Sequence, residues 1–311
     1  MRKETFTLNS SDGSSKLAGF LFLPEGEPRA VVQICHGMCE YILRYEEMAQ
    51  YLTDAGYAVC GIDHLGHGST AEMNEGGLGY FGEKGAWNNL VEDQEVERRA
   101  MSERFPDLPY FLLGHSMGSF LVRQYLCIKG EGICEAVILG TGNMPASLLR
   151  FGMFVTSTMA AVTGWRFRSR LVKLMVFGSY NKGIVPHRTA FDWISRDEAV
   201  VDTYRSEPKT SFDFTLNGYY NLFYSMLWLK KEEHLRRMRK DLPVLFASGT
   251  ADPVGSYGKG VEAAAESFRA HGVTHVDVKL YPADRHEILN ELDRQQVYED
   301  LWRWMEENRI P

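Results

Sequence analysis

The chain alternates between short runs of apolar residues and longer segments with helical spacing. Near-continuous apolar runs are typical of strands whose two faces are both covered by helices. Such runs occur at residues 30–35, 57–63, 110–115, 135–140, 243–248 and 276–282. Segments with helical periodicity lie between them, at residues 44–56, 88–105, 119–130 and 259–272. This alternation predicts an α/β protein with a mostly parallel central sheet and helices on both faces.

Two regions depart from this alternation. Residues 4–8 and 16–24 are strand-like and are joined by a turn-rich segment, which predicts an opening antiparallel pair. Between residues 143 and 240, aromatic and helical segments appear without clear strands. Because ligands of open α/β sheets bind at the carboxyl ends of the strands, we interpret 143–240 as a helical cap inserted over that edge. The predicted core is then formed by residues 1–142 and 241–311.

Composition narrows the class of protein. With 311 residues, 44% hydrophobic and 24% charged, the chain is an ordinary globular protein of one large domain with an insertion. A net charge of −7 argues against nucleic-acid binding, which needs a basic surface. The five cysteines include no C-x-x-C pair, and the N-terminus has no apolar signal core. We therefore expect reduced thiols and a cytoplasmic protein. Nothing in the pattern specifies an oligomeric state.

Residues 111–120 read FLLGHSMGSF and contain the pattern G-x-S-x-G, with Gly114, Ser116 and Gly118 at the fixed positions. In this pattern a strand turns sharply into a helix and holds the serine in a strained backbone geometry above the sheet. Glycine on both sides lets the strand and the helix approach where a Cβ atom would clash. The apolar run before the motif and the amphipathic segment after it are the surroundings that the motif requires. We therefore predict that Ser116 is a nucleophile and not part of an inert turn.

A serine hydroxyl is a poor nucleophile unless a base removes its proton and an acid orients that base. With this motif the chain order is serine, then Asp or Glu, then histidine. Asp252 and His286 each follow a predicted strand, so we expect both at the same sheet edge as Ser116. Ser116, Asp252 and His286 are thus the predicted catalytic residues. The competing residues are His187, His234, His271 and His275 for the base, and Asp63 and Asp284 for the acid.

The reaction also needs backbone N–H groups that bind the oxyanion formed on the attacked carbonyl. One donor is expected from Met117, directly after the nucleophile. The other is expected from the loop after the strand at 30–35, where His36 and Gly37 allow close backbone approach, and we assign it to Met38.

Five motifs occur in order along the chain: HGMCEYILRY, DHLGHGST, GHSMGS, ASGTADPV and RHEILNE. Together they resemble the α/β-hydrolase family of monoacylglycerol lipases and lysophospholipases, which is grouped with serine aminopeptidase-like hydrolases. The resemblance covers nearly the whole chain outside residues 143–240. It implies an α/β-hydrolase fold, a Ser116–Asp252–His286 triad, oxyanion donors at Met38 and Met117, and a helical cap over the pocket.

Two positions depart from the usual pattern of that family. Cys39 stands where members usually have glycine, and Tyr41 stands where they often have histidine. Both lie beside the oxyanion loop, so they bear on acyl or leaving-group preference more than on catalysis.

Asp63, His64 and His67 lie close together in the chain, but glycine between the histidines indicates a loop and not a rigid face of metal ligands. We therefore expect no metal site there and no other cofactor.

The predicted cap contains an uncharged apolar run, residues 151–165, followed by a basic segment. Fifteen residues are too few for a membrane-spanning helix, which needs about 20. The run is compatible with contact to a membrane surface or micelle, and equally with packing on the core. Further on, residues 211–229 carry enough aromatic residues to line an acyl pocket.

The predicted function is a serine carboxylic-ester hydrolase that acts through an acyl-enzyme on apolar acyl esters such as monoacylglycerols or lysophospholipids. One alternative is an aminopeptidase or amidase with the same triad and a carboxylate that holds the substrate ammonium group. Candidates for that carboxylate are Asp192, Asp197, Glu198 and Asp213. The other alternative is a ligand receptor or binding module with slow turnover.

Overall fold

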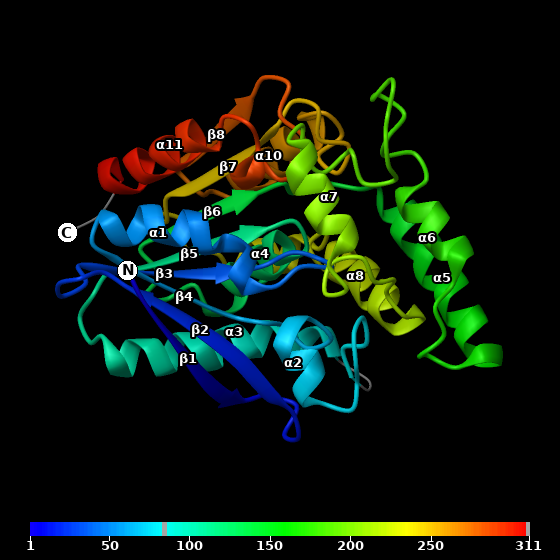
Figure 1. Ribbon diagram of the computed structural model, residues 1–311, viewed down its shortest axis with the longest axis horizontal. Helices are drawn as coiled ribbons and strands as arrows, with labels where there is room; N and C mark the ends of the chain where they lie inside the picture. The colour runs from blue at the N-terminus through cyan, green and yellow to red at the C-terminus, as the bar shows by residue number, and fades with distance from the viewer. Residues whose placement is uncertain (83–85, 309–311) are drawn as a thin grey trace.

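The computed structural model describes residues 1–82 and 86–308 and is built around one eight-stranded sheet (Figure 1). The strand order is β1-β2-β4-β3-β5-β6-β7-β8. β1 pairs with β2, and β2 with β4, in antiparallel fashion, whereas all later pairs are parallel. The strands are β1 Arg2–Asn9, β2 Lys16–Leu23, β3 Ala30–Cys35, β4 Tyr57–Ile62, β5 Tyr110–His115, β6 Glu135–Leu139, β7 Val244–Gly249 and β8 Val276–Tyr281. The predicted α/β class and the opening antiparallel pair are confirmed. Residues 309–311 of the predicted core lie outside the described residues.

Helices cover both faces of the sheet, which explains the continuous apolar runs. In β3, Val32 and Ile34 pack toward one face while Val31 and Cys35 pack toward the other, and all are fully buried. The first face is covered by α1 Glu46–Asp54 and α11 Arg294–Glu307. The second is covered by α3 Ala86–Arg104, α4 Met117–Lys129 and α10 Lys259–Ala270.

Two elements differ from the expectation. β8 was expected to be a near-continuous apolar run, but it lies at the edge of the sheet, and its exposed residues alternate with buried or half-buried ones. α11 follows the last strand and was not among the predicted helices. Only one stripe of this helix, which includes Val297 and Leu301, is buried against the first face of the sheet.

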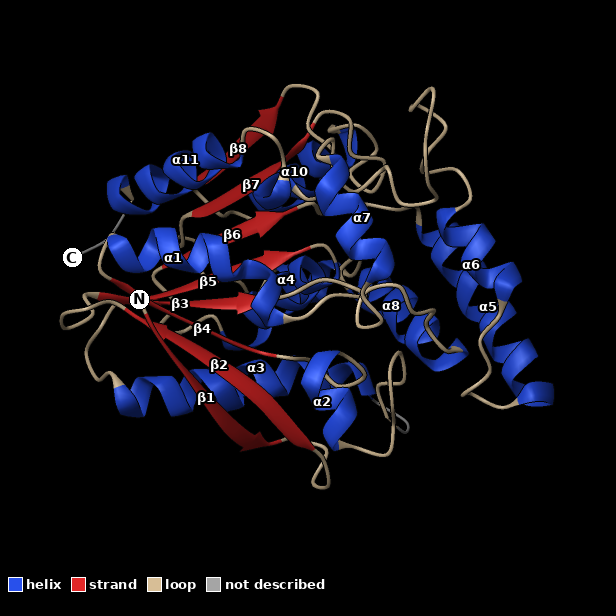
Figure 2. Cartoon of the chain, in the orientation of Figure 1, coloured by secondary structure: helices blue, strands red, loops and turns tan. Residues whose placement is uncertain are grey.

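The connection between β6 and β7 carries five helices, and we call it the α5–α9 segment. Its helices are α5 Ala146–Thr163, α6 Arg170–Phe177, α7 Glu198–Ser206, α8 Leu216–Trp228 and α9 Glu232–Leu235. Figure 2 shows this segment beyond the arrowheads of β3, β5 and β6, at the carboxyl edge of the sheet. α8 contacts α3, α4 and α5, so it joins the segment to the core, whereas α5 and α6 lie outermost. The remaining helices are α2 Gly68–Met73 and the short 3-10 helices Ile42–Tyr45 and Ile288–Asn290.

α5 exposes a large part of its apolar surface. The helix is 18 residues long because it begins before the uncharged run and includes Arg150. Within residues 1–82 and 86–308, it is the one helix long and apolar enough to cross a membrane by length and composition. Of its residues, 22% are buried in the protein. Phe154 and Val162 are 66% and 87% exposed. With 18 residues the helix is still shorter than the roughly 20 residues that a spanning helix needs, so its length and composition do not overturn the prediction that this run does not span a membrane.

Candidate active site

The nucleophile candidate lies where β5 passes into α4. Ser116 has φ +52° and ψ −116°, the strained conformation expected of this turn. A Cβ atom on Gly114 would lie 2.6 Å from the Gly118 carbonyl oxygen, and one on Gly118 would lie 1.9 Å from the carbonyl oxygen of Cys35. Both glycines are therefore required for the close approach of β5, α4 and the end of β3.

Asp252 and His286 come together from the loops after β7 and β8. Nδ1 of His286 lies 3.1 Å from the Asp252 carboxylate, which is fully buried. Asp252 also accepts hydrogen bonds from the Ser248 hydroxyl and the Val254 amide, at 2.9 and 2.8 Å. Burial raises the pKa of this carboxyl, but His286 and these hydrogen bonds outweigh burial and lower the pKa below its ordinary value. The carboxylate is thus held ionised beside the imidazole.

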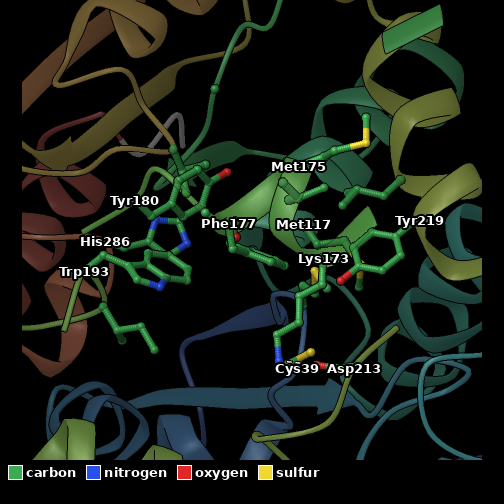
Figure 3. A pocket seen from close by; sticks show the side chains of 18 of the residues that line it. Cys39, Met117, Lys173, Met175, Phe177, Tyr180, Trp193, Asp213, Tyr219 and His286 are labelled. Atoms are coloured by element: carbon green, nitrogen blue, oxygen red, sulfur yellow. Dashed lines mark ion pairs between the residues drawn. The ribbon is translucent and has the colours of Figure 1, made fainter. Parts of the chain in front are cut away.

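Ser116 and His286 open onto one cavity of about 580 Å³ (Figure 3). This volume is in the range of ligand-binding pockets. Its walls are mainly apolar and aromatic, and they include Phe177, Tyr180, Trp193, Tyr219 and Phe223 from the α5–α9 segment. An apolar chain would fit such walls, with the serine at the polar end.

The two predicted oxyanion donors, Met38 and Met117, also line this cavity. Met117 is the first residue of α4, so its N–H belongs to the first turn of the helix and has no partner within the helix. The positive end of the helix dipole lies at the same place. The region beside Ser116 is thus suited to negative charge.

The competing histidines lie elsewhere. His271 follows the end of α10, and His275 precedes β8 at the opposite edge of the sheet. His234 stacks on Trp228 at 3.7 Å, and none of these histidines, nor His187, is among the described residues that line the cavity. Of the competing acids, Asp63 accepts backbone N–H groups from Ile42 and Ser69. The other, Asp284, contacts Arg196.

His64 and His67 are buried together with His36. The rings of His36 and His64 lie 3.9 Å apart, and Nε2 of His36 accepts a hydrogen bond from the His64 amide. Burial lowers the pKa of His64 to about 3 and that of His67 to about 4, so both imidazoles are neutral. They hold the loop after β4 against the oxyanion loop.

Sequence reasoning missed a second buried polar cluster behind Ser116. Glu40 accepts hydrogen bonds from the Gly37 amide, from the Tyr45 hydroxyl at 2.9 Å and from Nδ1 of His115 at 2.8 Å. Nε2 of His115 lies 3.3 Å from the carbonyl oxygen of His286. Both partners of this ring are acceptors only, which favours the doubly protonated ring. Burial lowers the pKa of His115, but the charge and hydrogen bond of Glu40 outweigh burial and raise it above its ordinary value.

The positive charges of this cluster lower the pKa of Glu40. Burial raises the pKa of Glu40, but His115 and Arg44 outweigh burial and lower it to about 2. Arg44 also donates to Glu287, directly after His286. The cluster therefore joins the oxyanion loop, the serine turn and the His286 loop. The only sequence signals for it were the charged residues of HGMCEYILRY and RHEILNE, which the spacing alone could not pair.

Several known proteins are similar to this chain. Residues 26–293 match the family described as "Serine aminopeptidase, S33". The monoacylglycerol lipase of Mycolicibacterium smegmatis is 27% identical over 297 residues, which cover 94% of each chain. The mouse monoglyceride lipase is 25% identical over 86% of this chain and 79% of its own. Among solved structures, a thermostable carboxyl esterase from Bacillus coagulans in complex with glycerol superposes with a TM-score of 0.91 at 31% identity, over 100% of both chains.

The family match spans most of the chain and runs from before β3 to beyond the His286 loop, so it includes every residue of the candidate site described above. This protein belongs to the serine aminopeptidase S33 family of α/β-hydrolases, is similar to monoacylglycerol lipases, and is a carboxylic ester hydrolase.

Proposed function

We propose that Ser116, His286 and Asp252 hydrolyse the ester through an acyl-enzyme. The observation that carries this proposal is the joint opening of Ser116 and the Asp252–His286 pair onto one apolar cavity. His286 takes the proton of the Ser116 hydroxyl as the Ser116 oxygen attacks the ester carbonyl carbon. The backbone N–H groups of Met38 and Met117 bind the oxyanion.

The second half of the reaction follows by symmetry. His286 returns its proton to the leaving alcohol, and the acyl group stays on Ser116. Water then gives a proton to His286 and attacks the acyl-enzyme. His286 returns that proton to the Ser116 oxygen as the acyl bond breaks, which releases the carboxylic acid and restores the serine. Asp252 keeps the imidazole in one tautomer throughout.

The substrate class that the cavity favours is an ester with one long apolar chain, such as a monoacylglycerol or a lysophospholipid. Residues 143–240 act as a cap that supplies most of the apolar wall. Relatives named as monoacylglycerol or monoglyceride lipases support this substrate class.

The aminopeptidase alternative has less support in the cavity. Of its four candidate carboxylates, Asp213 alone lines the cavity, and it pairs with Lys173 at 2.5 Å (Figure 3). A carboxylate already neutralised by a lysine is a poor partner for a substrate ammonium group. Ester hydrolysis makes no such demand on Asp213.

We also propose that the outer surface of α5 contacts a membrane surface or micelle. Its exposed apolar side chains lie on the helix that borders the cavity, as Phe151 and Leu148 of the same helix line it. A lipid would then enter the cavity from the surface in which it is dissolved.

The proposed function is tested by initial rates on para-nitrophenyl esters from acetyl to palmitoyl, with a monoacylglycerol, lysophosphatidylcholine and an aminoacyl arylamide alongside. We expect a maximum at medium or long chains, no turnover of the arylamide, and loss of nearly all activity in Ser116→Ala with an unchanged melting temperature. Activity on the arylamide alone, or tight binding without turnover, would favour the peptidase or the receptor.

A further inference from the structure

The stretch of the α5–α9 segment between α6 and α7 lies against the His286 loop. The His286 amide donates to the carbonyl oxygen of Trp193 at 3.3 Å, and the Glu287 amide donates to that of Ile194 at 2.8 Å. The Trp193 ring lies 5.1 Å from the His286 ring (Figure 3). Both the backbone and the ring of His286 thus contact residues 193–194.

Side chains strengthen this contact from both directions. The Arg285 guanidinium donates to the carbonyl oxygens of Asp192 and Ser195 at 2.6 and 2.8 Å. The Ser195 hydroxyl donates to the carbonyl oxygen of Asn290 at 2.9 Å. Residues 192–196 and 284–291 therefore form one continuous set of hydrogen bonds, which we call the clasp.

Arg196 carries the only guanidinium in the clasp that contacts carboxylates. Its Nε donates to Glu291 at 2.9 Å, and its terminal nitrogen donates to Asp293 at 2.7 Å and also to Asp284. The side chains of Asp284 and Glu291 are fully buried. Loss of the arginine would leave two buried carboxylates without their counter-charge, which is strongly destabilising for that arrangement.

The three carboxylates are arranged like the ligands of a cation. Their oxygens lie within 4.8 Å of one another, and the guanidinium contacts all three. Burial, and after it the charge of Glu291, raises the pKa of Asp284 to about 7. Arg196 thus provides the positive charge that this cluster requires.

His286 lies in a loop between β8 and the 3-10 helix Ile288–Asn290, so regular backbone pairing does not fix its orientation. Three supports hold it instead: the Asp252 hydrogen bond, the contacts of His115 and Arg44 with the loop, and the clasp. A displacement of about 1 Å in a reacting group can cost on the order of 100-fold in rate.

We propose that Arg196 is a positioning residue for the ester hydrolysis, which holds the His286 loop against residues 193–196 so that the imidazole stays aligned with Ser116 and Asp252. This inference rests on the proposed role of His286 as the base. Arg196 is not among the described residues that line the cavity, so its effect falls on kcat and not on KM.

The test compares Arg196→Gln and Arg196→Lys with the wild type on para-nitrophenyl acetate, a substrate too small to depend on the acyl pocket. The matched control is Arg188→Gln, because Arg188 lies in the same stretch and pairs with Glu198 and Asp202 on the surface. We expect kcat to fall about 10- to 100-fold in Arg196→Gln, with KM within about twofold of the wild type. Arg196→Lys keeps the positive charge but loses the forked guanidinium, so its kcat lies between those of Arg196→Gln and the wild type. Arg188→Gln behaves as the wild type.

Melting temperatures separate positioning from mere stability, and all rates are measured well below them. A wild-type kcat in the Arg196 variants, with only a lower melting temperature, would overturn the proposal, and so would a change in KM alone. If Arg196→Gln fails to fold, Arg196→Lys decides in the same way. Failure of the proposed function has a different signature, since the wild type would then be inactive or Ser116→Ala would retain activity.

Discussion

Gly118 shows how a hydrogen atom in place of a side chain permits the close packing at the site. Around it the end of β3 and the first turn of α4 approach so closely that the carbonyl oxygens of Cys35 and His36 would lie 1.9 and 2.6 Å from a Cβ atom. Neither oxygen belongs to a flexible side chain, so backbone would have to move. The parts that would separate are the oxyanion loop and the helix that carries Met117.

Gly118→Ala is therefore expected to lower both stability and activity. Overpacking of this kind costs roughly 1–3 kcal/mol in unfolding free energy. We expect the rate on para-nitrophenyl acetate to fall more than stability alone explains, because the backbone N–H groups of Met38 and Met117, the proposed oxyanion donors, move apart. Thermal denaturation and initial rates measure the two effects.

Gly26→Ala is the matched control for that substitution, since a Cβ atom there would meet nothing within 4 Å. An unchanged rate and melting temperature in Gly118→Ala would mean that the approach of β3 and α4 is looser than these distances indicate.

The helix α5 is the element whose surface is hardest to explain by folding alone. A helix in a globular protein normally buries its apolar stripe. Phe154 and Val162 instead face outward, and neither is among the described residues that line the cavity. Contact with a lipid surface would bury them and so give this surface a function.

Phe154→Ser with Val162→Ser is expected to reduce the rate on a monoacylglycerol presented in vesicles or micelles by several-fold, because less apolar area is buried at the lipid surface. The rate on soluble para-nitrophenyl acetate should not change, since both residues lie outside the cavity. Vesicle co-sedimentation measures the binding directly.

Ile128→Ser is the control, since Ile128 is 47% exposed on α4. Equal rates of the double variant and the wild type on vesicles would exclude the proposed role of this surface.

For the whole molecule, buried carboxyl groups set the dependence of stability on pH. Burial raises the pKa of Glu97 on α3 from 4.5 to about 8, and that of Asp93 on the same helix to about 6. Between pH 4.5 and 8 the folded protein keeps a proton on Glu97 that the unfolded chain releases. The stabilisation of the folded state by this group is therefore fully present below pH 4.5, and it is lost as the pH rises from there through 8.

Glu97→Gln removes this dependence, because the amide is neutral at every pH. The variant should gain stability over the wild type as the pH rises from 5 to 8, by on the order of 3 to 4 kcal/mol. Melting temperatures at the two pH values measure the gain. Glu103→Gln, an exposed position on the same helix, should show no such difference. An equal offset at both pH values would mean that Glu97 does not titrate in this range.

Most of the fold could be predicted from the sequence, because the periodicity of hydrophobic residues reflects which of them are buried. Strands with two covered faces were visible as apolar runs, whereas the edge strand β8 and the one-sided helix α11 bury too little to stand out. The meeting of Ser116, Asp252 and His286 at one edge of the sheet was predictable because each follows a strand, and parallel strands bring such positions to one edge. The Glu40–His115 pair was not, since its members are 75 residues apart and only the folded chain brings them together.

The clasp has a consequence for the exchange of parts between related proteins. A segment inserted between two strands is an obvious unit to transplant when an engineer wants a different substrate range. Here residues 192–196 carry hydrogen-bond partners of the loop that holds His286. A chimaera that imports a foreign segment between β6 and β7 therefore also replaces the support of its own histidine. Transplants that retain residues 192–196 of the recipient, or that import residues 284–293 of the donor with the segment, should keep their turnover.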